Sequence, residues 1–251
     1  RLVVFGPPRL ELDGRALPPS AWRAQRAFHL LLLLALRPRG ATRDELMETF
    51  WPGRQAAAGR RNFHPTLSYV RSVLPRGAAP PLLREGEIYR LNPAYAVSCD
   101  AWEWESELER ARRERGASER LAALERAVAL AERPPLEGVY GAWAEEVQRR
   151  WRDRQETTRI EAGRLRQQAG DAERALEHFR RAVELDEFRE TTYVSLIECL
   201  MALGNRGAAL AEYDRLRARL RRELAVDPLP ETEEAVRRAL GAAAADPVVT
   251  V

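Results

Sequence analysis

The chain has 251 residues, of which 45% are hydrophobic and 31% charged, and its net charge is +3. This composition is typical of a soluble globular protein, and the length is sufficient for two domains of ordinary size. The longest apolar run, Phe28 to Leu36, is too short to cross a bilayer, which excludes a membrane span and favours a cytoplasmic location.

The charge is divided unevenly along the chain. Residues 1–100 carry 15 arginines against 8 acidic residues, a net of +7, whereas residues 101–251 carry 26 arginines against 30 acidic residues, a net of −4. A basic half joined to an acidic half predicts that one part binds a polyanion and the other binds something else. Every basic residue is arginine, so the placement of the arginines is more informative than their number.

In chain order, the first hundred residues alternate short strands with helices. Asp13-Gly14 between two apolar segments is a hairpin-turn signal. Thr42 with Glu45 forms a capping-box pattern that predicts a helix start. The expected strands are 2–5, 9–12 and a hairpin over 82–91 turning at Glu85-Gly86; the expected helices are 22–36, 43–50 and a third that follows Trp51-Pro52-Gly53. This order predicts a winged helix-turn-helix with an extra small sheet, as a domain of residues 1–99.

The third helix is the most informative stretch, because no Asp or Glu occurs between Glu48 and Glu85. Apolar residues recur there at i, i+4, i+7 and i+11, which predicts a buried helix face made of Phe63, Leu67, Val70 and Leu74. The opposite face is then predicted to carry Arg61, Ser68, Tyr69 and Ser72. An acid-free face of arginine and small polar residues suits a groove lined with phosphates.

Pro65 leaves the start of this helix open. In a helix interior it removes a backbone hydrogen bond and costs about 3 kcal/mol. Either the helix begins close to Pro65, or it runs from about Ala57 with a kink.

From Asp100 onward the pattern is helical. Helices are expected at 101–113, 118–131, 141–169, 171–185, 189–203, 206–224 and 230–240. Residues 170–179 align with residues 204–213 at a spacing of 34, the tetratricopeptide period. Small residues (Ala175, Ala209) recur where two helices approach, each followed by an aromatic residue (Phe179, Tyr213). We therefore expect an all-α, tetratricopeptide-like domain over residues 100–251 and a mainly α protein with a small β component.

No pattern in the chain calls for catalysis. The Gly-rich, nucleophile-elbow and metalloprotease motifs are absent, and Cys99 and Cys199 resemble buried apolar residues rather than a disulfide or metal pair. His29 is expected in the core, and His178 is expected to be partly exposed. The chain is therefore predicted not to be an enzyme, and we expect no cofactor and no metal.

With these residues in place, the chain resembles the antibiotic-regulatory-protein class of bacterial transcriptional activators. Members join an OmpR-like winged helix to a bacterial transcriptional activation domain of tetratricopeptide-like helices. The resemblance rests on residues 43–46, 50–52, 61–64, 66–71 and 89–91 in the first domain, and on residues 100–103, 135–138, 143–145, the two repeats and residues 224–232 in the second. It implies an activator that binds direct repeats in double-stranded promoter DNA, with self-association on tandem sites, and that recruits RNA polymerase through its sigma subunit.

The predicted DNA contacts fall into groups. Base reading is expected from Arg61, Ser68, Tyr69 and Ser72, and phosphate contact from Arg43, Arg76, Arg84 and Arg90. Arg71 fits either role, and Arg60, Asn62, His64 and Thr66 complete the predicted interface. The alternative is a tetratricopeptide-type scaffold or adaptor without specific DNA recognition, which leaves the acid-free stretch without a role.

Overall fold

The structure, a computed structural model, describes residues 1–22, 24–53, 56–75, 77, 79–95 and 97–242. The chain folds into two compact units. Unit 1 comprises Arg1–Glu103 and Arg133–Gln148, and unit 2 comprises Trp104–Glu132 and Arg149–Val251. The predicted division into 1–99 and 100–251 stays a prediction, because the compact units interleave along the sequence.

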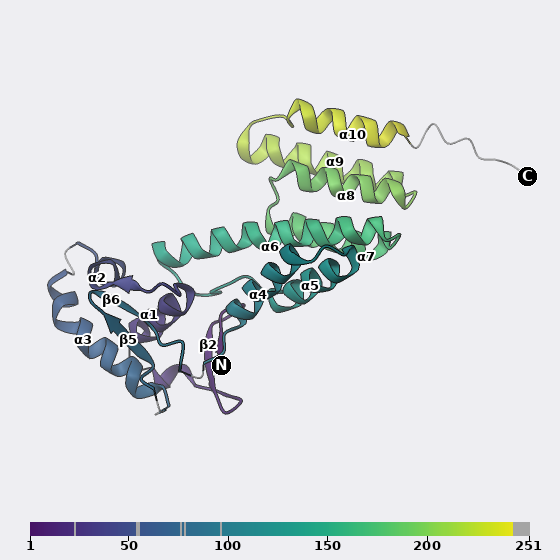
Figure 1. Cartoon of the computed structure of the whole chain (residues 1–251). Coiled ribbons are helices and arrows are strands. Elements are labelled where there is room, and N and C mark those ends of the chain that lie inside the picture. Colours follow the sequence, from purple (N-terminus) through teal and green to yellow (C-terminus); the bar gives the residue numbers. More distant parts are fainter. Residues whose placement is uncertain (23, 54–55, 76, 78, 96, 243–251) are drawn as a thin grey trace, which may run out of the picture. The chain divides into compact units, whose positions relative to one another are not determined.

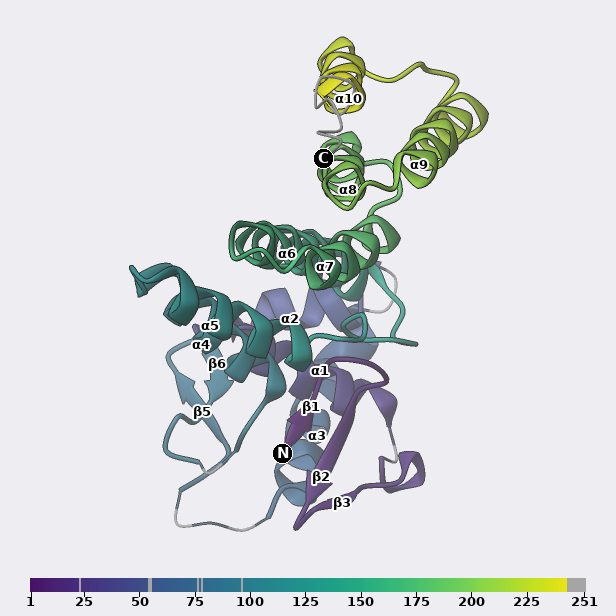
Figure 2. The ribbon, with the colours of Figure 1, turned by 90° about the vertical axis from the view of Figure 1, so that its right-hand side faces the viewer.

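Unit 1 begins with a small antiparallel sheet in which three strands lie side by side in the order β1-β2-β3 (Figure 2). The strands are β1 (Leu2–Val3), β2 (Arg9–Leu12) and β3 (Arg15–Ala16). Asp13 and Gly14 connect β2 to β3 with φ values of 50° and 76°, the left-handed backbone of a tight hairpin turn. The extra amino-terminal sheet predicted from this dipeptide is therefore confirmed.

Three helices follow, namely α1 (Gln25–Leu36), α2 (Arg43–Phe50) and α3 (Ala56–Val73) (Figure 1). The Glu45 amide donates to the Thr42 hydroxyl at 3.2 Å, and the Thr42 amide donates to the Glu45 carboxylate at 2.6 Å. This is the predicted capping box, and α2 has the predicted bounds. The predicted start of the first helix at Trp22 is wrong, because Trp22 lies ahead of the helix with its ring buried.

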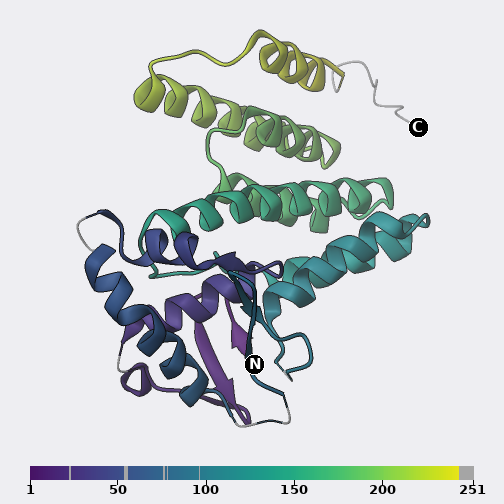
Figure 3. The ribbon, with the colours of Figure 1, turned by 60° about the vertical axis from the view of Figure 1, so that its left-hand side comes forward.

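A second sheet of three strands has the order β4-β6-β5. Its strands are β4 (Ala41–Thr42), β5 (Leu82–Glu85) and β6 (Ile88–Leu91). Glu85 pairs with Ile88, so the hairpin turns at Gly86-Glu87, one residue later than predicted. Three helices followed by this hairpin confirm the winged helix, in which α3 lies against α1 (Figure 3).

Residues 133–148 also belong to unit 1. The Gly6 amide donates to the Pro134 carbonyl at 2.8 Å, and the Leu136 amide donates to the Val4 carbonyl at 2.9 Å. The Trp143 ring packs 6.0 Å from the Phe50 ring, measured between centroids. The segment that follows β1 thus holds residues that lie more than a hundred positions away in sequence.

Unit 2 is built from helices, as predicted for the second half. The helices of this half are α4 (Asp100–Arg113), α5 (Ala117–Leu130), α6 (Ala142–Gln168), α7 (Ala172–Leu185), α8 (Glu190–Ala202), α9 (Arg206–Arg219), the π-helix η3 (Leu220–Leu224) and α10 (Pro230–Ala242). Among the described residues, no helix is both long enough and apolar enough to cross a membrane.

The 34-residue repeat appears as two equivalent helix starts. Asp171 caps α7 by accepting from the Arg174 amide at 3.3 Å, and Asn205 caps α9 by accepting from the Ala208 amide at 3.2 Å. Phe179 is fully buried, and a Cβ added at Gly163 would come within 2.8 Å of its ring. A residue without a side chain therefore lets α6 pass close to the aromatic of α7, which is how such repeats pack.

Candidate nucleic-acid interface

The buried face of α3 is the one predicted from sequence. Phe63, Leu67, Val70 and Leu74 are 0%, 1%, 0% and 4% exposed. Four apolar side chains at helical spacing bind the helix to the rest of unit 1, so the opposite face is held in a fixed orientation.

The outward row of α3 follows from the same geometry. Arg61, Pro65, Ser68 and Ser72 are spaced at i, i+4, i+7 and i+11, and all four are exposed. The helix continues through Pro65, so the second sequence alternative, a start near Ala57, agrees with the observed extent. Because residue 65 has no N–H, the Arg61 carbonyl receives no bond from it, and on an exposed face that carbonyl remains accessible to water or to a ligand.

Exposed cations lie on this row and beside it. Arg60, Arg61 and Arg71 are exposed, and within the described residues none of them forms an ion pair. His64 is also exposed, and its ring stands edge-on to Phe63 with centroids 5.4 Å apart. Guanidinium groups without a carboxylate partner are available to phosphate oxygens or to the edge of guanine.

Three hydroxyl-bearing side chains of the predicted interface have partners within the protein. The Thr66 hydroxyl donates to the carbonyl of Asn62, itself exposed, at 2.7 Å, and the Ser72 hydroxyl donates to the Tyr69 carbonyl at 2.8 Å. The Tyr69 phenol donates to the Ala21 carbonyl, and its ring lies 6.4 Å from Trp22 in an edge-on arrangement. Tyr69 therefore fastens the segment before α1, which its sequence position alone did not indicate.

Arg43 lies at the first turn of α2, half-buried between α3 and the hairpin. Its guanidinium carbon lies 5.8 Å from the centroid of the Phe63 ring, and its amide donates to the Glu87 carbonyl at 3.0 Å. Its Nε is buried and has no hydrogen-bond partner among the described residues. The stem packs in the protein, so only the end of the side chain is placed to reach a phosphate.

The wing hairpin carries arginines that already have carboxylate partners. Arg84 lies 3.1 Å from Glu87, and Arg90 lies 2.5 Å from Glu85. The hydrogen bond from Arg90 lowers the pKa of the Glu85 carboxyl. A phosphate must therefore compete with these carboxylates for the guanidinium groups of Arg84 and Arg90. The fourth predicted phosphate contact, Arg76, lies outside the described residues.

Gly59 and Arg26 both contact Trp51, and neither contact was predicted from the sequence. A Cβ added at Gly59 would lie 2.9 Å from the Trp51 Cβ, so the glycine allows the first turns of α3 to approach Trp51. The Arg26 guanidinium carbon lies 5.7 Å from the centroid of the Trp51 ring on the same tryptophan. A lone glycine inside an otherwise helical stretch is the sequence signal that could have indicated this close approach.

Both cysteines are buried, and two of the three histidines, His29 and His178, are partly buried. Cys99 and Cys199 are buried, as predicted, and burial raises the pKa of the Cys99 thiol to about 12. Burial lowers the pKa of His29, which packs 6.1 Å from the Trp143 ring, and also lowers that of His178, which is half-buried. No group of three His, Cys, Asp or Glu residues suited to a metal ion occurs in the described part of the chain.

The chain is similar in sequence and in fold to known bacterial proteins. Residues 99–240 match the model of the bacterial transcriptional activator domain. The fold is similar to that of a solved structure of Mycobacterium tuberculosis EmbR in complex with a low-affinity phosphopeptide, with a TM-score of 0.75 and 18% sequence identity. The aligned region covers 97% of this chain and 68% of the EmbR chain. None of the curated proteins matches. The matched model covers more than half of the sequence and confirms the resemblance drawn from its motifs: the chain belongs to the bacterial transcriptional activator domain family.

Proposed function

We propose that this protein is a transcriptional activator that binds double-stranded promoter DNA by placing α3 in the major groove. The observation that carries the proposal is the outward face of α3, which has exposed arginines and no acidic residue. A helix fits the major groove, and arginine is the side chain most often found on guanine there. Transcription takes place where the bacterial chromosome lies, so the proposed location is the cytoplasm.

The surroundings of each interface residue indicate which role it is proposed to have. Arg61 and Ser68 on the outward row are proposed to read bases, whereas Arg60 and Arg71 on its flank are proposed to hold phosphates. Asn62, His64 and Ser72 add exposed polar groups beside them. Tyr69, Thr66 and Arg43 are proposed to contribute mainly by fixing the helix and its neighbours, because they have contacts within unit 1.

Binding is tested by fluorescence anisotropy of the whole chain on DNA fragments selected by the protein. Arg61→Ala is expected to cost about 1–3 kcal/mol on the selected site and to relax specificity at one position. Arg113→Ala is the matched control, since Arg113 is exposed but pairs with Glu109 at 3.0 Å. Equal losses for both variants, or binding that does not change with salt, would favour the scaffold alternative.

We further propose that copies bind direct repeats head to tail and that the helical half recruits RNA polymerase through its sigma subunit. A single winged helix covers little DNA, roughly 600–1,000 Å² of protein surface, so tandem copies would add affinity. Inserting about 5 bp between repeats turns one copy to the opposite side of the duplex. Cooperative binding should then be lost while affinity for each single site remains; a palindromic footprint would exclude the head-to-tail arrangement. Recruitment is tested separately, by pull-down of purified sigma subunit with the whole chain.

A further inference from the structure

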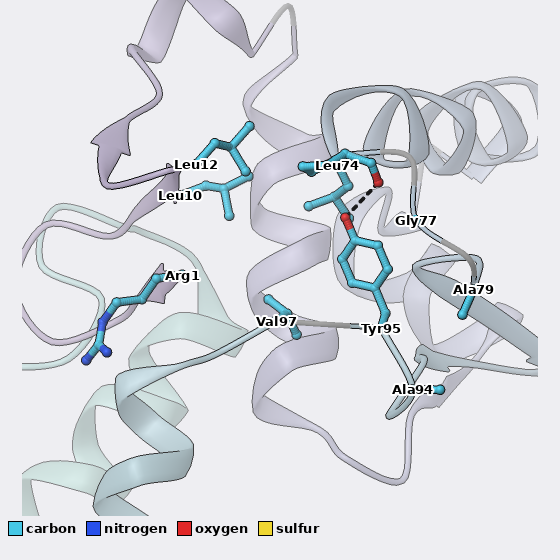
Figure 4. A pocket seen from close by; sticks show the side chains of 10 residues that line it. Arg1, Leu10, Leu12, Leu74, Gly77, Ala79, Ala94, Tyr95 and Val97 are labelled. Carbon is cyan, nitrogen blue, oxygen red and sulfur yellow. Dashed lines mark hydrogen bonds between the residues drawn. The ribbon is translucent and has the colours of Figure 1, made fainter.

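A partly enclosed cavity of about 330 Å³ lies within unit 1, beside the C-terminal end of α3 (Figure 4). Leu10 and Leu12 of β2 form one side, Leu74 and Pro75 mark the end of α3, and Tyr95 closes the other side. Three segments that are far apart in sequence thus meet around one space.

The chemistry of the wall selects for an uncharged occupant. Among the described residues that line the cavity, the side chains are aliphatic or aromatic except for Arg1, and none is acidic. The Arg1 guanidinium is bound by both Glu103 carboxylate oxygens, at 2.9 Å and 2.8 Å, so its charge is already compensated. An anion therefore gains little here, whereas an apolar molecule would bury its surface against leucine and tyrosine.

The size of the cavity limits the occupant. An apolar cavity of about 150 Å³ in a protein core is sufficient for benzene. A space of about 330 Å³ is close to twice that volume, which corresponds to a molecule of about two fused rings.

One hydrogen bond links the cavity to α3. The Tyr95 phenol donates to the Pro75 carbonyl at 2.9 Å, directly after the helix (Figure 4). Burial raises the pKa of Tyr95, so the phenol remains a donor at neutral pH. Asn92 anchors the Tyr95 segment by donating from its side chain to the Pro80 carbonyl at 2.8 Å, and its own carbonyl accepts from the Tyr95 amide at 3.0 Å. A molecule that moves the Tyr95 ring would therefore act on the end of α3.

We propose that this cavity is a binding site for a small, neutral, largely apolar molecule of about two fused rings, and that occupancy shifts the C-terminal end of α3. The effect on DNA affinity rests on the function proposed above, whereas the binding itself does not. The site is distinct from the outward row of α3, because Leu74, the residue directly after the helix, continues its buried face.

The probe is 2-naphthol, a neutral two-ring molecule, titrated into the whole chain with carbon-13-labelled leucine methyl groups. Leu10, Leu12 and Leu74 methyl signals should shift and saturate, while the Leu220 signals in unit 2 should not. The anionic analogue 2-naphthalenesulfonate should bind at least about tenfold more weakly, because the described residues that line the cavity offer no free cation. Absence of saturable shifts at the three leucines would overturn the site, and equal binding of the sulfonate would overturn its assignment to a neutral ligand.

Gly77 provides a variant that fills the cavity. A Cβ added there would lie 3.6 Å from a Tyr95 ring carbon, an ordinary contact distance, so a longer side chain would extend into the space. Gly77→Leu should weaken 2-naphthol binding at least about tenfold, whereas Gly207→Leu, a control glycine with no atom within 4 Å of its added Cβ, should leave it unchanged. Circular dichroism confirms that both variants fold; unchanged binding by folded Gly77→Leu would overturn the assignment to this cavity.

The link to α3 has its own test. Tyr95→Phe keeps the ring and removes the bond to Pro75, so 2-naphthol should still bind and should still shift the methyl signals of the three cavity leucines. In the wild type, 2-naphthol should change DNA affinity at least about threefold, and this change should be absent in Tyr95→Phe. A wild-type protein that binds both DNA and 2-naphthol without mutual effect would overturn the coupling. A protein that binds 2-naphthol but no DNA would contradict the proposed function and leave the cavity assignment standing.

Discussion

Arginine is abundant in both units, but its neighbours differ. On α3, Arg60, Arg61 and Arg71 are exposed and have no carboxylate partner within the described residues. In unit 2, several arginines of similar exposure are paired about one helical turn away, such as Arg181 with Glu184 at 2.7 Å and Arg113 with Glu109 at 3.0 Å. Others in unit 2, such as Arg149 and Arg152, are exposed and form no ion pair within the described residues. Phosphate must compete with a carboxylate for a paired guanidinium, so the number of arginines says less about DNA binding than their partners do.

The largest expected effects on stability come from replacing a buried aromatic residue in each unit. Phe63 in α3 and Phe179 in α7 are both 0% exposed. Phe63→Ala and Phe179→Ala should each lower the free energy of unfolding by about 3–5 kcal/mol, because each leaves a cavity in a packed core. Urea unfolding measures the loss, and hydrogen exchange assigns it to the unit that carries the substitution. Only Phe63→Ala should also weaken DNA binding by the folded protein; an equal loss in both variants would remove the distinction between the units.

Next come the flanking arginines of α3. Arg60→Gln and Arg71→Gln should each weaken binding to all DNA sequences alike, and each should reduce the slope of log K against log salt by about 0.9. Arg181→Gln in unit 2 is the matched control and should leave the slope unchanged. A slope that falls equally in the control would show that paired arginines of unit 2 also contact DNA.

A smaller effect is expected from two half-buried histidines, one in each unit. Burial lowers the pKa values of His29 and His178, so the unfolded chain binds protons more readily than the folded one. Stability should therefore be complete above the unfolded pKa of about 6.5 and should be lost as the pH falls below it, by at most about 1.4 kcal/mol per pH unit for each histidine.

Urea unfolding between pH 7.5 and pH 5.5 measures this dependence. His29→Gln should reduce the pH dependence of unit 1, and His178→Gln that of unit 2. If neither substitution changes the slope, the histidines are not the groups responsible.

The smallest effect is expected at the wing. Glu85→Gln removes the carboxylate that binds Arg90, so the arginine becomes available to phosphate and DNA affinity should rise slightly. Anisotropy at low salt is the most sensitive measurement, since screening weakens such exposed interactions. A fall in affinity would mean that Glu85 positions Arg90 for DNA rather than competing with it.

Local signals in the sequence determined much of the fold. The capping box of Thr42 and Glu45, the Asp13-Gly14 turn and the apolar row of α3 depend on residues within a few positions of one another, and each was confirmed. The 34-residue repeat was visible for the same reason, because each repeat forms similar local contacts. Periodicity and turn chemistry act over short distances, so a single sequence contains them.

Tertiary structure alone decided which side chains of the predicted DNA interface have no partner among the described residues and remain available to DNA. Tyr69 bonds to Ala21 across 48 positions, and residues 133–148 join the winged helix through bonds to Val4 and Gly6. The cavity beside α3 likewise arises where β2, Leu74 and Tyr95 meet. Contacts between distant segments depend on how whole elements pack, and neither helical period nor turn signals contain that information. The sequence by itself thus determined which face of α3 points outward, and packing decided which of its polar groups already have partners.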